Sequence, residues 1–242
     1  KYYSAMNILK FGGTSVGSVD RIKNVAGLIQ DQTPCIVVLS AMSGTTDKLV
    51  ETGRLLSEGE KEQAEKIIAS LEEKYNEVVQ DLYYTKEIKE EARLLINEKF
   101  QELRSYKDEE VSGKEEKEIL AQGEMISTHL FYFHLKEKEV QSKLIPALEF
   151  MRLNKDDEPD NEYIEQNIPP YLEAGYETAI FITQGYICRN ARGEVDNLKR
   201  GGSDYTATLI GAAIKADEVQ IWTDIDGVHN NDPRYVKDTQ PV

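Results

Sequence analysis

The sequence predicts an α/β fold with a parallel sheet, because strand-like and helix-like segments alternate from one end of the chain to the other. The first strand is expected at residues 8–11, where Gly12 and Gly13 break an apolar run before apolar residues recur at helical spacing up to Ile29. The run CIVVLS at 35–40 repeats this arrangement, with a turn of small residues and a second helix after it. Two successive strand–turn–helix units are typical of parallel sheets.

Residues 58–117 are rich in Glu, Lys, Leu and Ile and are predicted to form a helical insertion. Ile67, Leu71, Tyr75 and Val78 recur at the spacing of one helical face. The charge runs around them are typical of a solvated helix surface, so we assign no chemistry to this segment.

The second half of the chain continues the alternation. We expect a helix through 130–135, a strand at 139–150, a polar loop at 154–162 and a helix at 163–172 that two prolines interrupt. A buried strand at 178–187, a helix at 203–216 and a strand at 218–225 follow. Ser203 is expected to cap that helix, with Asp204 in its first turn.

Composition bounds the class of protein. The 242 residues are 40% hydrophobic and predict one domain. The 44 acidic residues against 29 basic ones give a net charge of −15, which disfavours binding to nucleic acid or anionic membranes. Cys35 and Cys188 lie in apolar runs, so we expect buried thiols in a reducing, cytoplasmic compartment. We recognise neither a signal peptide nor the roughly 20 apolar residues of a membrane span.

A first candidate site is Lys10-Phe11-Gly12-Gly13-Thr14-Ser15, between the first strand and the first helix. Backbone N–H groups at such a junction can face a phosphate. It is not a Walker A loop, because Lys10 precedes the glycines instead of following them. An ordinary turn with an incidental lysine is the alternative.

A second candidate site is Arg200-Gly201-Gly202-Ser203-Asp204, which opens the helix at 203–216. The glycines permit close backbone approach, and the guanidinium of Arg200 matches the geometry of a carboxylate. The alternative is a glycine-rich turn with Ser203 as a helix cap.

A third candidate is the polar loop at 223–234, which follows a predicted strand, where α/β proteins often bind ligands. The spacing of Asp224, Asp226, Asn230 and Asp232 does not match a calcium-binding EF-hand loop, so we assign no metal to these residues. His129 and His134 lie among apolar helical neighbours, where packing is the expected role.

Together these segments resemble the aspartokinase family within the amino-acid kinase superfamily. The motifs are KFGGTSVGS at 10–18, LSAMSGTTDKL at 39–49, QGE at 122–124, TQGYI at 183–187, KRGGSDYTA at 199–207 and IWTDIDGVHNNDPR at 221–234. The resemblance implies a three-layer αβα sandwich with a mainly parallel central sheet and a helical insertion. It also implies transfer of the γ-phosphoryl group of ATP to the β-carboxylate of L-aspartate, the first step of lysine, threonine and methionine biosynthesis.

The resemblance assigns a role to each matching residue. Lys10 and Asp204 are the implied catalytic residues, and Mg²⁺ accompanies ATP, held mainly by ATP and water. The implied aspartate-binding residues are Ser40, Thr46, Glu124, Arg200 and Ser203. The implied ATP-binding residues are Lys10, Gly12, Gly13, Ser15, Thr223, Asp224, His229, Asp232 and Arg234.

Some positions depart from the family pattern. Lys199 stands where the family usually has Gly, Tyr186 where it often has Phe, and His229 where Tyr is common. The family continues beyond Val242 with more of the kinase domain and then regulatory ACT domains, so we expect residues 1–242 to be a catalytic domain truncated at its C-terminal end, which forms a homo-oligomer when full length. The run at 221–234 is similar to that of bifunctional aspartokinase/homoserine dehydrogenases.

Two alternative functions stay open at this point. One is another kinase of the superfamily, acting on glutamate, uridylate or carbamate, although Glu124 with Arg200 favours an amino-acid zwitterion. The other is a regulatory module that binds nucleotide without turnover, which the presence of Lys10, Arg200 and Asp204 disfavours.

Overall fold

The computed structural model describes residues 6–173, 180–199, 201–223, 236 and 239–240. Its core is a five-stranded sheet with the strand order β3-β4-β2-β1-β7, in which every neighbouring pair is parallel. The strands are β1 (Asn7–Phe11), β2 (Cys35–Leu39), β3 (Ser142–Leu144), β4 (Ile180–Gln184) and β7 (Glu218–Trp222). The predicted parallel sheet is therefore confirmed.

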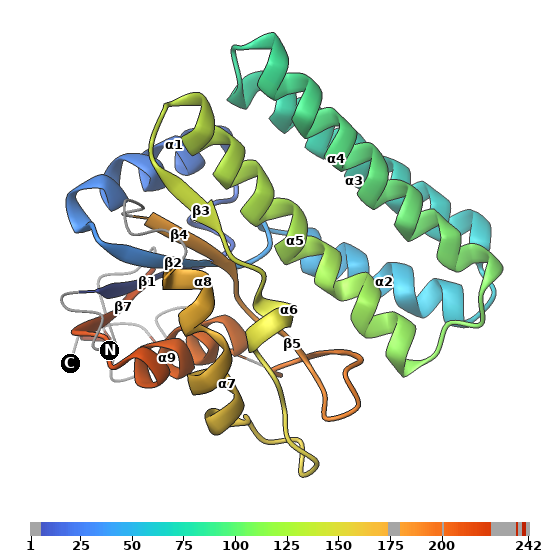
Figure 1. Cartoon of the computed structure of the whole chain (residues 1–242). Helices are drawn as coiled ribbons and strands as arrows, with labels where there is room; N and C mark the ends of the chain where they lie inside the picture. Colours follow the sequence, from blue (N-terminus) through green and yellow to red (C-terminus); the bar gives the residue numbers. More distant parts are fainter. Residues whose placement is uncertain (1–5, 174–179, 200, 224–235, 237–238, 241–242) are drawn as a thin grey trace.

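Helices cover both faces of the sheet, which is the middle of three layers (Figure 1). One side carries α1 (Val19–Leu28), η1 (Ile29–Gln32), α2 (Thr45–Ser57), α3 (Lys61–Leu82), α4 (Lys86–Ser105), η2 (Tyr106–Asp108) and α5 (Gly113–Glu137). The other side carries α6 (Ala147–Phe150), α7 (Asn161–Asn167), α8 (Pro169–Glu173) and α9 (Gly202–Ile214). Two short strands, β5 (Ile187–Arg189) and β6 (Val195–Asn197), form an antiparallel ribbon. The expected αβα sandwich is confirmed.

The alternation of side chains along β1 determines which face of the sheet Lys10 occupies. Successive side chains of a strand point to opposite faces of the sheet. Leu9 and Phe11 pack into the hydrophobic cluster that contains α1 to α5, whereas Ile8 packs into the cluster that contains α9. Lys10 shares the face of Ile8, and it lies near the carboxyl end of the strand. Its ammonium group can therefore leave the apolar core at the sheet edge next to α9.

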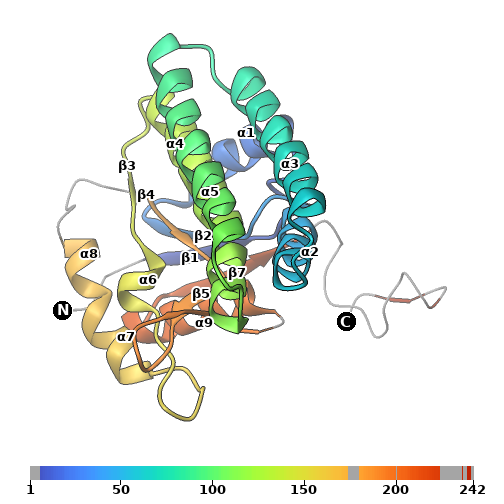
Figure 2. The ribbon, with the colours of Figure 1, turned by 90° about the vertical axis from the view of Figure 1, so that its right-hand side faces the viewer.

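The segment 58–117 is largely helical, as predicted, and contains α3, α4, η2 and the start of α5. Helices α3 and α4 form a hairpin that packs alongside α5 and projects away from the sheet (Figure 1; Figure 2). Most of the apolar face predicted for α3 is buried. Ile67 is only partly buried, however, and Ile68 lies in the core instead.

The strand predicted at 139–150 is wrong over most of its length. Only Ser142–Leu144 pairs with β4, and Ala147–Phe150 forms the helical turn α6. Pro146 has no N–H to donate to a sheet ladder. The next donor, the N–H of Ala147, bonds to the side-chain oxygen of Gln184 at 2.9 Å, so the chain turns away from the sheet at this point.

The predicted cap of α9 is also wrong. The N-cap residue is Gly201, with φ +75°, and Ser203 lies one residue inside the helix. The left-handed backbone at Gly201 lets the helix start two residues earlier than the Ser203 cap would allow. The hydroxyl of Ser203 is therefore free of a capping role and is available to the neighbouring cavity.

Both cysteines are buried and free, as the apolar runs predict. Burial raises the pKa of each thiol to about 12, so both stay protonated at neutral pH. Among the described residues, no helix combines the length and the apolar content that a membrane span requires.

Glu137, at the end of α5, ties the turn between α3 and α4 to the rest of the fold. Its Oε1 atom accepts hydrogen bonds from the N–H groups of Tyr84 at 3.0 Å and Thr85 at 2.8 Å, and from the hydroxyl of Thr85 at 2.9 Å. Thr85 is the N-cap residue of α4, so the carboxylate fixes the start of that helix to the end of α5.

Replacing Glu137 with alanine should lower the free energy of unfolding by about 2 kcal/mol, because three partly buried donors lose their acceptor. Glu137→Gln keeps an oxygen at this position and should lose less than about 1 kcal/mol. Urea unfolding followed by circular dichroism measures both variants. Equal losses would contradict a role for the side-chain oxygen.

Candidate active site

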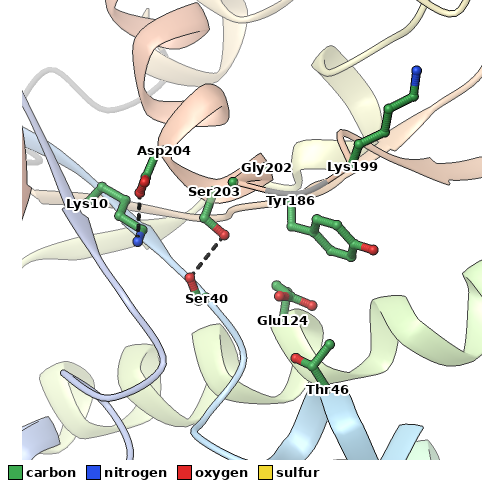
Figure 3. Close-up of a pocket in the computed structure, with 10 residues that line it drawn as sticks. Lys10, Ser40, Thr46, Glu124, Tyr186, Lys199, Gly202, Ser203 and Asp204 are labelled. Atoms are coloured by element: carbon green, nitrogen blue, oxygen red, sulfur yellow. Dashed lines mark hydrogen bonds and ion pairs between the residues drawn. The ribbon is translucent and has the colours of Figure 1, made fainter. Parts of the chain in front are cut away.

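A cavity of about 420 Å³ opens at the carboxyl ends of the parallel strands. It receives Lys10 from β1, Ser40 from the loop after β2, Thr46 from α2, Glu124 from α5 and Asp204 from α9. Parallel strands end at one edge of the sheet, so residues far apart in sequence meet there. The full lining is Lys10, Ser40, Thr46, Glu124, Tyr186, Lys199, Gly201, Gly202, Ser203 and Asp204 (Figure 3).

An ion pair joins Lys10 and Asp204 at one end of the cavity. Their Nζ and Oδ1 atoms are 2.7 Å apart, and the side chains are 13% and 51% exposed, respectively. Asp204 lies in the first turn of α9, where a carboxylate also complements the helix dipole. A Cβ atom on Gly12 would lie 3.4 Å from the Lys10 ammonium, so the absence of a side chain leaves room beside the charge.

A hydroxyl pair lies next to this ion pair. The Oγ atom of Ser40 donates to the Oγ atom of Ser203 at 3.0 Å, across the cavity from the β2 loop to α9 (Figure 3). This approach depends on Gly185, where a Cβ atom would lie 2.5 Å from the Ser203 oxygen. Ser203 thus lines the cavity, although it is not the helix cap.

Glu124 lies at the other end of the cavity and is 4% exposed. Its Oε1 atom accepts a hydrogen bond from the N–H of Ala41 at 3.1 Å. Burial raises the pKa of the Glu124 carboxyl to about 7, against the lowering effect of that hydrogen bond. Within the described part of the chain this carboxylate forms no ion pair, so a cationic ligand group would find an uncompensated negative charge.

Tyr186 faces Glu124 and Thr46 from the opposite wall (Figure 3). Burial raises the pKa of its phenol, and the charge of Glu124 adds to this effect. Tyr186 has φ +68° and Lys199 has φ +61°. Glycine adopts a positive φ without strain, so the backbone at Lys199 has a conformation that favours glycine. The Lys199 side chain points away from Glu124 and Thr46 (Figure 3).

The phosphate-binding motif predicted at 10–15 lies beside the cavity, not in its lining, apart from Lys10. Residues 12–18 form a loop, and α1 begins only at Val19, after Ser18 accepts a hydrogen bond from the N–H of Arg21. Gly13 packs against the loop after β2, since a Cβ atom there would lie 2.6 Å from the Ala41 oxygen. The N–H of Ser15 bonds back to Gly12 at 3.0 Å, and so stabilises the turn.

The structure brings most of the residues predicted for catalysis and aspartate binding together in one cavity. Lys10, Ser40, Thr46, Glu124, Ser203 and Asp204 line the cavity. Thr223 follows β7 and is not part of that lining. Arg200, Asp224, His229, Asp232 and Arg234 lie outside the described residues. The lining also contains Tyr186, Lys199, Gly201 and Gly202, which belong to the TQGYI and KRGGSDYTA motifs but are not among the predicted binding residues.

No group of three or more His, Cys, Asp or Glu side chains that could hold a metal ion occurs among the residues that the structure describes. The two carboxylates of the cavity are already engaged, Asp204 with Lys10 and Glu124 with the Ala41 N–H. A metal ion at this site would therefore need most of its ligands from a bound molecule or from water.

Similarity to known proteins agrees with this geometry. A model of the amino acid kinase family matches residues 5–242. The aspartokinase of Chlamydia trachomatis serovar D is 35% identical over 243 residues, covering 97% of this chain and 52% of the relative. The lysine-sensitive aspartokinase 3 of Escherichia coli K12 is 33% identical over 237 residues, covering 96% of this chain and 52% of the relative.

A crystal structure of E. coli aspartokinase III in complex with aspartate and ADP matches the fold with a TM-score of 0.84 and 30% sequence identity. The match covers 98% of this chain and 53% of that structure, so the chain spans about half the length of the relatives it resembles. Because the family model extends over residues 5–242 and the αβα fold agrees with it, the chain belongs to the amino acid kinase family.

Proposed function

We propose that this chain is the catalytic part of an aspartate kinase, which transfers the γ-phosphoryl group of ATP to the β-carboxylate of L-aspartate and forms 4-phospho-L-aspartate. The observation that carries the proposal is the charge arrangement of one cavity, with a cation, Lys10, at one end and the buried carboxylate of Glu124 at the other. The names of the relatives and the aspartate and ADP bound in the matching crystal structure support the same reaction.

Glu124 favours an amino acid as the acceptor. Ionising a buried carboxyl group costs free energy, and a neighbouring ammonium group offsets that cost. The α-ammonium of aspartate would supply this charge, with Thr46 and Ser40 as hydroxyl partners for the rest of the substrate. Arg200 would pair with the α-carboxylate, as the family resemblance implies. A substrate without an amino group would leave Glu124 uncompensated.

The reaction needs no general base, because the β-carboxylate is already ionised at neutral pH. One carboxylate oxygen attacks the γ-phosphorus, the bond from that phosphorus to the β,γ-bridging oxygen breaks, and ADP leaves. The Lys10 ammonium stabilises negative charge on the phosphoryl group in transit. Asp204 holds the ammonium in place through the 2.7 Å contact.

Magnesium is expected to enter with ATP, and the described residues fit such an ion. Mg²⁺ in kinases usually keeps several waters and needs only one or two protein carboxylates. Asp204, the carboxylate nearest to Lys10, could contact the ion through water while it keeps its ion pair, and ATP and water would supply most of the ligands. The bound ion would supply neutralisation of phosphate charge.

Trapping the acyl phosphate with hydroxylamine tests the proposed reaction. The chain should form hydroxamate with ATP and L-aspartate, but not with L-glutamate as acceptor. Product from glutamate would favour another kinase of the superfamily. ATP binding by calorimetry without product from any acceptor would favour a nucleotide-binding module.

Lys10→Ala should lower kcat by at least about 100-fold and change the aspartate Kd less than about threefold, because the ammonium acts on charge that develops in the transition state. Lys117→Ala is a matched control, since Lys117 also forms a 2.7 Å ion pair, with Asp196, but lies outside the cavity lining. Equal losses in kcat and aspartate affinity in Lys10→Ala would contradict a transition-state role.

Aspartate affinity should increase as the pH rises through about 7, the pKa of Glu124, and then level off. Glu124→Gln should weaken aspartate binding at least about tenfold at pH 8 and remove this pH dependence. Calorimetric titration between pH 6 and pH 8.5 measures both effects. A wild-type affinity that is independent of pH would contradict the assignment of Glu124 to the ammonium group.

The same carboxyl should make the unliganded protein less stable at higher pH. Its folded-state pKa of about 7 lies above the ordinary value of 4.5, so its stabilising contribution is complete below pH 4.5 and is lost as the pH rises to 7. The stability of the wild type relative to Glu124→Gln should fall over this range by on the order of 3 kcal/mol. Urea unfolding at pH 4.5 and pH 8 would show no such difference if Glu124 were solvated.

A further inference from the structure

The segment of residues 40–46, here called the substrate loop, comprises the turn after β2 and the first two residues of α2, and it carries Ser40 and Thr46 into the cavity. Its first half is held by α5, because the N–H of Ala41 donates to Glu124 and Gly123 leaves almost no space beside Ala41. A Cβ atom on Gly123 would lie 2.8 Å from the Ala41 Cβ atom. The second half of the loop reaches a different element, helix α3 of the hairpin.

Tyr75 of α3 reaches the substrate loop from inside the core. It is 0% exposed, and its hydroxyl lies 2.9 Å from the Oγ1 atom of Thr45, which is also 0% exposed. The aromatic ring packs against Phe100 of α4, with centroids 6.1 Å apart, so the hairpin sets its position. Burial, together with the charge of Glu124, raises the pKa of the Tyr75 phenol, which stays neutral. Thr45 directly precedes the cavity residue Thr46.

Lys74, the neighbouring residue of α3, holds the same loop at a second point. Its Nζ atom donates to the carbonyl oxygen of Ser43 at 2.8 Å, and the N–H of Ser43 donates to the carbonyl of Gly13 at 3.1 Å. Burial and the nearby charge of Lys48 lower the pKa of Lys74. Lys48 itself bonds to Ser70 of α3 at 3.0 Å. Lys74 is thus connected to the glycine-containing loop after β1 through a single residue.

We propose that the helical hairpin contributes to the active site, because Tyr75 and Lys74 are positioning residues for the substrate loop. Tyr75 sets the aspartate side, through Thr45 and Thr46, and Lys74 sets the phosphate side, through Ser43. A phenylalanine would fill the same space as Tyr75, so the hydroxyl is not needed for packing. A buried hydroxyl pair specifies one loop position because any other position leaves both groups without a partner. The assignment of one side to aspartate and the other to phosphate rests on the proposed function.

Tyr75→Phe removes one hydroxyl and keeps the ring. It should raise the aspartate Kd about tenfold, which corresponds to the loss of one buried hydrogen bond, with a smaller change in the ATP Kd. The matched control is Tyr83→Phe. Tyr83 is 3% exposed, directly follows α3 and donates to the carbonyl of Leu130 at 2.7 Å, away from the substrate loop. This control should lose comparable stability and keep aspartate affinity.

A double-mutant cycle separates positioning from a general loss of structure. In a Thr45→Val background the hydrogen bond is already absent, so adding Tyr75→Phe should change the aspartate Kd less than about twofold. If Tyr75 acted only through core packing, its effect would be the same in both backgrounds.

Lys74→Met keeps the aliphatic part of the side chain and removes the donor to Ser43. It should raise the ATP Kd about threefold and affect aspartate less. Lys66→Met, about two turns earlier on α3, is its control. The proposal is overturned if both α3 variants match their controls in aspartate and ATP affinity.

Hydrogen exchange by mass spectrometry makes this test independent of the reaction. Amide exchange within 41–46 should accelerate in Tyr75→Phe and Lys74→Met, and should be unchanged in both controls. If the wild type bound no aspartate but the loop loosened as expected, the proposed substrate would be wrong and the positioning role would stand. Unchanged exchange in the α3 variants would overturn the positioning role whatever the substrate.

Discussion

The candidate site depends on the parallel pairing of β1 with β2 on one side and with β7 on the other. Parallel strands end at a common edge, so the segments that follow Phe11, Leu39 and Gln184 come together there. The chain leaves β1 toward β2 and returns later to the opposite side of β1, a reversal that opens a crevice in such sheets. Lys10 lies at this crevice because the alternation of β1 directs it toward α9.

Glycines determine how closely the site is assembled. The Ser40–Ser203 hydrogen bond requires Gly185, and the approach of α5 to the substrate loop requires Gly123, because a Cβ atom at either position would overlap a neighbour. Gly13 packs on the same loop from the β1 side. The cavity therefore has little freedom to rearrange, which suits a reaction in which positioning and charge stabilisation supply most of the catalysis.

At this site, the buried charge that favours ligand binding lowers the stability of the empty protein. The chain has a net charge of −15, which repels anions at long range, yet Lys10 is only 13% exposed and acts on a nearby anion through a medium of lower dielectric constant. Glu124 is buried without a cation among the described residues, which destabilises the empty protein at neutral pH. A ligand ammonium would offset the cost of burying the Glu124 charge. The desolvation that destabilises the empty protein would therefore favour ligand binding.

The sequence by itself determined the alternation of strands and helices, the parallel sheet, the helical character of 58–117 and the cavity residues of the KFGGTS, LSAMSGTT, QGE and GGSD motifs. The first three follow from apolar periodicity, which a single segment contains, whereas the cavity residues follow from the resemblance of these motifs to the aspartokinase family. The early end of β3, the start of α9 at Gly202, the pKa of Glu124 and the contacts of Tyr75 and Lys74 with the substrate loop were decided only by the tertiary structure. The physical reason is that each depends on a neighbour distant in sequence: Gln184 accepts the donor after Pro146, Tyr186 packs against Gly202, and Thr45 meets a helix whose own sequence predicts only a buried apolar face.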